Sequence, residues 1–140
     1  RGLIHGMMQN HAKAIEDFSK AIELNSKYFD PYNFRGIAKK KLGNYTGAVQ
    51  DFTKAIELNP KYAGTYLDRG NTKDELQDLS GAIEDYNKAI ELNPRYAAAY
   101  NNRGVAKNKM GNKADACLDW NAAVELGFAA ADENLKKFCQ

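Results

Sequence analysis

The stretch YFDPYNFRGIAKKKLGNYTGAVQDFTKAIELNPK, residues 28–61, decides the fold because the chain repeats it. Residues 62–95 and 96–128 carry the same pattern of aromatic, glycine and alanine positions, each copy 34 residues beyond the last. The positions that recur most clearly are Tyr32, Tyr66 and Tyr100, then Gly36, Gly70 and Gly104, and then Ala48, Ala82 and Ala116. A period of this length is typical of solenoids, in which each copy folds as one small unit and neighbouring copies stack.

Each copy is predicted to form two helices. Asp30 followed by Pro31 is a favourable start, because a carboxylate can cap free N–H groups and proline lacks a donor that would be unpaired there. Gly43-Asn44 tolerates the left-handed conformation that ends many helices, and Pro60 stops the second helix. The predicted helices span residues 30–43, 46–58, 64–77, 80–92, 98–110 and 114–126.

The two ends of the array depart from this pattern. The register extended backwards reaches Gly2, Ala14 and Phe18, which predicts that the chain opens inside a repeat, part way through the first helix of a partial pair. Arg1 is no initiator methionine, so we expect further sequence upstream. At the other end, residues 129–138 predict a helix with one apolar side, which would cover the last exposed face of the stack.

The pattern as a whole resembles the tetratricopeptide repeat. It has an aromatic at the fourth position of each unit, glycine at the eighth, alanine at the twentieth and twenty-seventh, an aromatic at the twenty-fourth and, in two copies, proline at the thirty-second. The resemblance covers residues 1–128 and implies an all-α fold, a right-handed superhelical solenoid of antiparallel helix hairpins with a C-terminal capping helix. It divides a single domain over residues 1–140 into a partial repeat at 1–27, repeats at 28–61, 62–95 and 96–128, and a capping helix at 129–140.

Two departures from the family pattern concern single positions. Lysine stands at the eleventh position, as Lys39, Lys73 and Lys107, where the family usually has an aromatic and where we expect partial burial. Gln77 replaces the glycine that ends the first helix in the other copies. We therefore expect the middle repeat to turn differently or to end its first helix more loosely.

Composition and motifs argue against several function classes. The 20 basic and 18 acidic side chains are mixed along the chain, so no basic stripe indicates a nucleic-acid partner. No apolar run approaches the roughly 20 residues needed to cross a bilayer, so no membrane partner is expected for this chain. The usual nucleotide, protease, hydrolase and redox motifs are absent, and we predict neither an enzyme nor a cofactor. The spacing of His5 and His11 places them on different faces of a helix, so no metal site is predicted.

Charged residues also recur in register with the repeat. The aspartates are Asp17, Asp51, Asp85 and Asp119, and the arginines are Arg35, Arg69 and Arg103. A group that recurs in every unit belongs to the architecture, whereas catalytic groups are singular. Our hypothesis is that the arginines and aspartates pair, within a hairpin or between hairpins.

The two cysteines are too few to define a disulfide framework, and they do not fix the compartment. Cys117 stands on the predicted second helix of the last repeat and Cys139 at the end of the predicted capping helix, which we expect to pack on that hairpin. The favoured interpretation is two partly buried free thiols in a reducing compartment, and the alternative is a disulfide that holds the cap.

Recurrent tyrosines allow a second interpretation of the helix faces. They are Tyr28, Tyr62 and Tyr96, together with Tyr32, Tyr66 and Tyr100. Such rings can stack on the bases of a single strand, but these stand at core positions of the family pattern without a basic groove. Packing is therefore favoured, and no nucleic-acid partner is predicted.

The resemblance also implies where a partner binds, because the first helix of each hairpin lines a concave groove in this architecture. Positions that vary between copies are candidates for reading a ligand. The candidate groove residues are Asn33, Ile37, Lys40, Lys41, Leu67, Asn71, Asp74, Asn101, Val105 and Asn108. Their mixture of amide and aliphatic side chains suits an extended peptide or a partner helix, so a protein or peptide is the predicted partner.

Charge narrows the prediction for the ligand. Some family members grip a C-terminal carboxylate with basic residues that include lysine at the fifth position, where this chain has Asn33, Leu67 and Asn101. Specificity for chaperone tails is therefore not expected. We expect Lys40 and Lys41 to face Asp74 and Glu75 one repeat later, which would give the groove charge polarity and favours a ligand of mixed charge.

Two alternatives to a peptide-binding scaffold stay open at this point. The open face of the incomplete first hairpin could bind a second copy and form a homo-oligomer. The chain could also be an accessory region of a longer enzyme or receptor.

Overall fold

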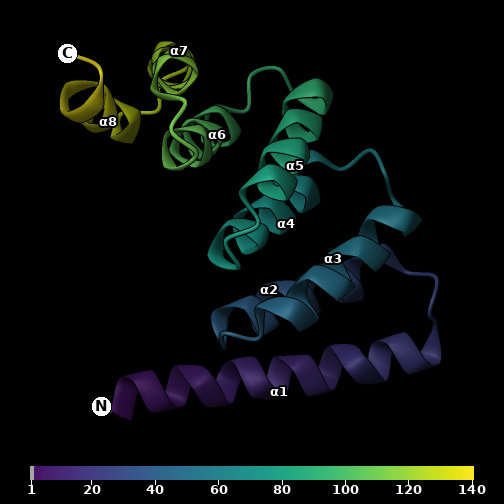
Figure 1. The fold of residues 1–140 in the computed structure, drawn as a ribbon. Helices are drawn as coiled ribbons and strands as arrows, with labels where there is room; N and C mark the ends of the chain where they lie inside the picture. Colours follow the sequence, from purple (N-terminus) through teal and green to yellow (C-terminus); the bar gives the residue numbers. More distant parts are fainter. Residues whose placement is uncertain (1) are drawn as a thin grey trace.

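The computed structural model describes residues 2–140, with side chains from Met7 onward. This part of the chain forms eight helices and no strand. They are α1 (Gly2–Leu24), α2 (Phe29–Lys41), α3 (Tyr45–Leu58), α4 (Ala63–Glu75), α5 (Leu79–Leu92), α6 (Ala97–Lys109), α7 (Lys113–Glu125) and α8 (Ala130–Phe138). Each helix packs chiefly on the one before and the one after it, and the two ends of the chain lie at opposite ends of the stack (Figure 1). The predicted all-α solenoid is confirmed.

The two helices of each hairpin lie close together because a glycine of one faces an aromatic ring of the other. A Cβ atom added at Gly36 would lie 2.7 Å from Cε1 of Phe52, far inside the usual contact distance. The same contact recurs in the next hairpin, where a Cβ at Gly70 would lie 2.8 Å from Cε1 of Tyr86. Both rings are completely buried, so glycine at the eighth position makes room for the aromatic at the twenty-fourth.

The turn at Gln77 shows that one sequence expectation was wrong. Gln77 adopts a φ of 64°, in the same left-handed region as Gly43 at 84°. The backbone hydrogen bonds also match, because Asp78 N donates to Lys73 O as Asn44 N donates to Lys39 O. The middle repeat thus turns like its neighbours, and the packing of α4 on α5 offsets the left-handed strain of about 1–2 kcal/mol for a residue with a Cβ.

The N-terminal segment departs from the predicted partial helix pair. Residues 2–24 form one continuous helix, α1, and the positions that match the later turns, Gln9 and Asn10, are helical. Neither residue is a glycine, so continuing the helix avoids the cost of a left-handed turn.

The first helix of the first full repeat begins one residue earlier than predicted. α2 begins at Phe29 with Tyr28 at the N-cap position, and no side chain caps it. Asp30 therefore lies within the first turn, where its charge still interacts favourably with the helix dipole. At the start of α3, by contrast, Oδ1 of Asn44 accepts a hydrogen bond of 3.0 Å from the backbone N–H of Gly47.

Buried charge clusters hold each hairpin together, which confirms the predicted pairing of arginine with aspartate. In the first hairpin, Arg35 donates from Nε and Nη2 to the two oxygens of Asp51, at 2.8 and 2.7 Å. Nζ of Lys39 lies 3.0 Å from the same carboxylate, which explains why lysine is tolerated at the eleventh position. Arg35 also donates to Oγ of Ser19 on α1 and so links neighbouring units. Its hydrogen bond to Asp51 raises the pKa of Arg35, although burial opposes this.

The same cluster recurs in the other two hairpins. Its members are Arg69, Asp85 and Lys73 in one, and Arg103, Asp119 and Lys107 in the other. Each aspartate side chain is at most 6% exposed, and each arginine lies over the ring of the tyrosine three residues earlier. We call these three sets the charge clusters.

The predicted packing role is confirmed for four of the recurrent tyrosines. Tyr32 and Tyr66 are buried, with 8% and 7% exposure, and Tyr96 and Tyr100 are half-buried and pack against core clusters. Tyr28 and Tyr62 are instead exposed, at 63% and 49%, so position in the repeat does not fix burial for every ring.

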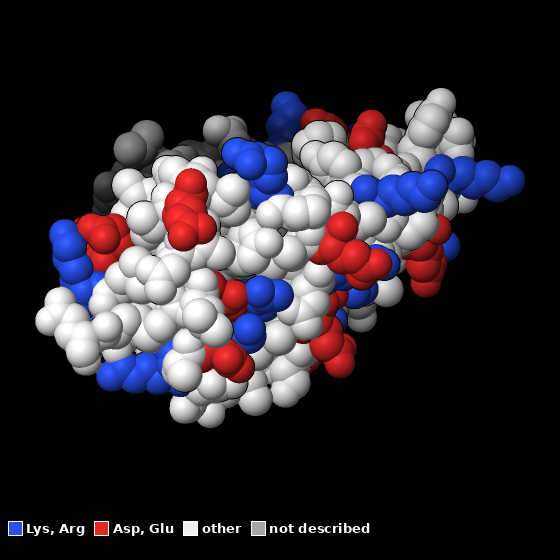
Figure 2. Space-filling model, turned by 90° about the horizontal axis from the view of Figure 1, so that it is seen from above, with Lys and Arg blue, Asp and Glu red and all other residues white. Residues whose placement is uncertain are grey.

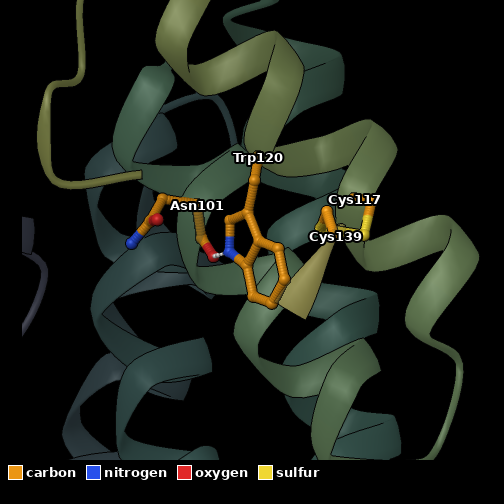
Figure 3. Close-up of a disulfide and its surroundings, with 4 residues drawn as sticks. All are labelled: Asn101, Cys117, Trp120 and Cys139. Atoms are coloured by element: carbon orange, nitrogen blue, oxygen red, sulfur yellow. Dashed lines mark hydrogen bonds between the residues drawn. A yellow bond between two sulfur atoms is a disulfide. The ribbon is translucent and has the colours of Figure 1, made fainter. Parts of the chain in front are cut away.

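The C-terminal cap is held by a disulfide, so the favoured interpretation of two free thiols was wrong. Cys117 on α7 and Cys139 after α8 are bonded to each other. Figure 3 shows the disulfide beside Trp120, whose ring also stacks on Phe138 with centroids 5.6 Å apart. The contacts that bring α8 onto α7 place the two sulfur atoms within bonding distance, and helical spacing alone could not show this.

Candidate peptide-binding groove

The first helices of the three hairpins border a polar hollow of about 250 Å³. Its lining residues are Lys40 from α2, Asn71, Asp74 and Glu75 from α4, and Asn102 and Val105 from α6. Four of the predicted groove residues, Lys40, Asn71, Asp74 and Val105, thus lie together around one hollow. Because three hairpins contribute to it, the hollow depends on the stacking of the solenoid.

The side chain of Asn71 is held in the hollow by two hydrogen bonds. Its Oδ1 accepts a hydrogen bond of 2.7 Å from the hydroxyl of Tyr86 and one of 2.9 Å from Nδ2 of Asn102. Burial raises the pKa of Tyr86, with further contributions from Asp74, Asp85 and Glu75, so the hydroxyl stays protonated and able to donate. Among the described residues, nothing accepts a hydrogen bond from Nδ2 of Asn71, which leaves two donors for a ligand.

The hydrogen bonds continue from Asn102 to the C-terminal cap. Nδ2 of Asn101 donates to Oδ1 of Asn102, and Nδ2 of Asn134 on α8 donates to Oδ1 of Asn101, both at 3.2 Å. The backbone oxygen of Asn101 accepts from Nε1 of Trp120, also at 3.2 Å (Figure 3). We call the series Asn71, Asn102, Asn101 and Asn134 the amide ladder.

Charges of both signs border the groove. Lys109 donates to Oδ1 of Asp74 at 2.9 Å, while Lys40 and Glu75 line the same hollow. On α4, burial raises the pKa of Asp68, and the charge of Lys40 opposes this. Basic and acidic side chains are likewise interspersed on the face shown in Figure 2, without a continuous field of one sign.

Some predicted groove residues lie elsewhere or serve packing. Asn33 is only 6% exposed, and its Oδ1 accepts a hydrogen bond from Oγ1 of Thr65. Leu67 packs into the core against Tyr66. Lys41 borders a different hollow, formed with Met7, Met8 and His11 at the N-terminal end.

The other predicted groove residues are half-buried. Ile37 and Asn108 do not line the hollow, and Asn101 lies one step away from it along the amide ladder.

Glu75 and Asn102 also line the hollow but were not among the predicted groove residues. Asn102 stands at the sixth position, where the other copies have Phe34 and Asp68. This position varies as strongly as the ninth, so comparison of the copies could have found it. Phe34 stacks on Phe18 at 5.7 Å, which shows that the sixth position serves different purposes along the stack.

Within the part of the chain with described side chains, no group of three or more His, Cys, Asp and Glu residues is placed to hold a metal. His11 borders the N-terminal hollow, and the side chain of His5 lies outside the described residues. No helix among residues 2–140 is long and apolar enough to cross a membrane.

A stack of helix hairpins, with a polar hollow bordered by their first helices, defines the chain as a helical repeat protein. The family models described as tetratricopeptide repeat match residues 1–28 and 29–62, and a third, described as TPR repeat, matches residues 75–111. The chain belongs to the tetratricopeptide repeat family, whose members are generally non-catalytic scaffolds.

Solved structures support this assignment. The crystal structure of MamA is 28% identical, with a TM-score of 0.82, over 87% of this chain and 71% of that chain. The first TPR of Spaghetti (RPAP3), bound to the HSP90 peptide SRMEEVD, is 26% identical, with a TM-score of 0.78, over 83% of this chain and 94% of that chain. The TPR domain of OM64 from Arabidopsis is 27% identical, with a TM-score of 0.73, over 78% and 94% of the two chains. No curated protein matches the sequence.

Proposed function

We propose that the chain is a scaffold that binds an extended peptide or a partner helix across α2, α4 and α6. The observation that carries the proposal is the hollow whose Asn71 amide is fixed by two hydrogen bonds and has two donors free. A side chain held in this way loses little conformational freedom on binding, so the hydrogen bonds that it makes to a ligand cost less entropy. We propose that repeats 28–61, 62–95 and 96–128 act as one binding unit with the cap.

A peptide suits this hollow better than a small apolar molecule. The lining combines amide donors with one aliphatic side chain, Val105, and with charges of both signs. Peptide backbones offer carbonyl acceptors at regular intervals, and their side chains can meet Lys40 and Glu75. The ligand is therefore of mixed charge, and no nucleic acid is proposed, because the groove offers no basic stripe.

The structure bound to an HSP90 peptide supports peptide binding by this fold but not the same specificity. Leu67 stands at the fifth position of the middle repeat and packs into the core. It offers no positive charge to a terminal carboxylate, so an internal segment is the better candidate ligand.

The proposal is tested by selecting peptides from a random display library against the chain. A selected peptide is then titrated against the Asn71→Ala/Asn102→Ala variant by calorimetry. We expect about tenfold or greater weakening, because two hydrogen-bonding side chains are lost. Asn121→Ala, an exposed asparagine on α7, is the matched control and should bind as the wild type does. Equal affinity for all three proteins, or no selected peptide at all, would refute groove binding.

Self-association is a second candidate function, favoured by the N-terminal hollow. Met7 and Met8 are 52% and 51% exposed there, beside His11 and Lys41. Sedimentation across a hundredfold concentration range tests this candidate. A Met7→Lys/Met8→Lys variant should remain monomeric where the wild type dimerises, and a monomeric wild type at all concentrations would exclude it. As an accessory region of a longer protein, the chain would keep the same groove.

A further inference from the structure

We infer that the capping helix α8 supports the binding groove from outside the hollow and that Asn134 is a positioning residue for the groove amides. This inference deepens the proposed function and rests on it. Asn134 does not touch the hollow itself. It acts through Asn101 and Asn102, which connect it to Asn71.

Comparison with the repeats shows that Asn134 is unusual at its position. It stands 34 residues beyond Tyr100 and 68 beyond Tyr66, at the fourth position of the pattern. In the repeats this position carries a tyrosine that packs beside an arginine of its own hairpin. In α8 it carries an amide that donates to the preceding hairpin instead.

The amide ladder is a directed series of hydrogen bonds. Each nitrogen donates to the oxygen of the next amide, from Asn134 through Asn101 and Asn102 to Asn71. An amide with its oxygen engaged has a fixed orientation, whereas an amide without a donor can rotate. Removing the first donor therefore frees Asn101, and this change passes to Asn102 and Asn71.

The disulfide holds this first donor in place. Cys139 lies five residues after Asn134, directly after the end of α8, and it is bonded to Cys117 on α7. The same end of α8 is packed by Phe138 against Trp120, and Trp120 donates to the backbone of Asn101. The cap is thus connected to Asn101 twice. Asn134 contacts it directly, and Phe138 contacts Trp120, which in turn donates to it.

The first test uses Asn134→Ala and Asn134→Leu, which remove the amide and favour a helix. Leucine also keeps the side-chain volume. In the free protein, we expect the side-chain amide NMR signals of Asn71 and Asn102 to shift in both variants and to remain unchanged in Asn121→Ala. A peptide selected from the display library against the oxidised wild type should bind about three- to tenfold more weakly to both variants, with an unchanged melting temperature.

Unchanged NMR signals together with unchanged affinity would overturn the inference and leave the proposed function standing. Shifted signals with no peptide obtained from the library would refute the proposed function and support the positioning role of Asn134.

The second test reduces the disulfide with a phosphine. We expect the wild type to lose affinity for the same peptide by about the same three- to tenfold factor on reduction. A Cys117→Ala/Cys139→Ala variant should bind weakly both with and without the phosphine. Equal affinity of the oxidised and reduced wild type would show that the disulfide does not hold Asn134 in place.

Discussion

The charge clusters and the amide ladder are both networks of polar side chains, yet they differ in how they follow the repeat. The charge clusters have the same residues at the same positions in all three hairpins. The amide ladder draws on the ninth, sixth, fifth and fourth positions of different units and occurs once. A network that every unit repeats serves the stability of the unit. A network that occurs once, at the groove, is free to serve a partner.

Replacing a buried aspartate gives the largest expected effect on the first of these networks. Asp85→Ala leaves Arg69 and Lys73 without their carboxylate inside the hairpin. We expect a loss of about 3 kcal/mol in the free energy of unfolding, at the low end for a broken buried ion pair because Arg69 keeps some exposure. Urea denaturation measures it, with Glu84→Ala, an exposed residue of α5, as control. Equal stability of the two variants would contradict a structural role for the charge clusters.

The second prediction concerns the close approach of the paired helices. In Gly70→Ala, the new methyl group meets the ring of Tyr86. We expect the free energy of unfolding to fall by about 2 kcal/mol, since overpacking outweighs the better helix propensity of alanine. Thermal unfolding measures the change. Gln50→Ala on the exposed face of α3 should not lower stability, and a stabilised Gly70→Ala variant would show that the helices can move apart freely.

The third prediction concerns the hydroxyl of Tyr86, which connects the buried core of its hairpin to Asn71 of the amide ladder. Tyr86→Phe keeps the buried ring but removes the hydroxyl that donates to Asn71. We expect a loss of about 1 kcal/mol in stability and weaker peptide binding, because Asn71 then has one restraint fewer. The matched exchange is Phe52→Tyr in the preceding hairpin, where Ile37 stands at the ninth position and cannot accept the hydroxyl. Peptide affinity equal to that of the wild type in Tyr86→Phe would argue against a role of the hydroxyl in binding.

The smallest expected effect lies at the turn of the middle repeat. Gln77→Gly relieves the left-handed strain at this residue, and we expect a gain of less than about 1 kcal/mol, because glycine also loses more entropy on folding. The reciprocal Gly43→Gln should destabilise the equivalent turn. The midpoint of urea unfolding measures both changes, and shifts in the same direction would contradict the shared turn geometry.

The features that recur in every repeat could be predicted from the sequence, whereas several features that occur only once could not. Residues in strict register predicted the helices, the stacking and the pairing of Arg35 with Asp51. The family resemblance, together with variation between the copies, predicted Lys40, Asn71, Asp74 and Val105, which line one hollow. Burial and bonding between residues of different units could not be predicted in this way, because they depend on how the units dock in three dimensions.

Three examples show the physical reason. Asn33 stands at a position expected to face the groove, but it is buried, and its Oδ1 accepts a hydrogen bond from Oγ1 of Thr65 in the next hairpin. The Cys117–Cys139 disulfide depends on how α8 docks, which helical spacing does not fix. Gln77 turns as glycine does because the packing of two helices outweighs a local preference.

The most direct test of the account maps a bound peptide onto the chain. Backbone and side-chain amide NMR signals are followed while a peptide selected from the display library is added to the oxidised wild type. The account predicts that the perturbed signals lie on α2, α4 and α6 around the hollow, with the side-chain amides of Asn71 and Asn102 among the largest. Perturbations confined to α3, α5 and α7, or to the end of α1 around Met7 and Met8, would contradict it.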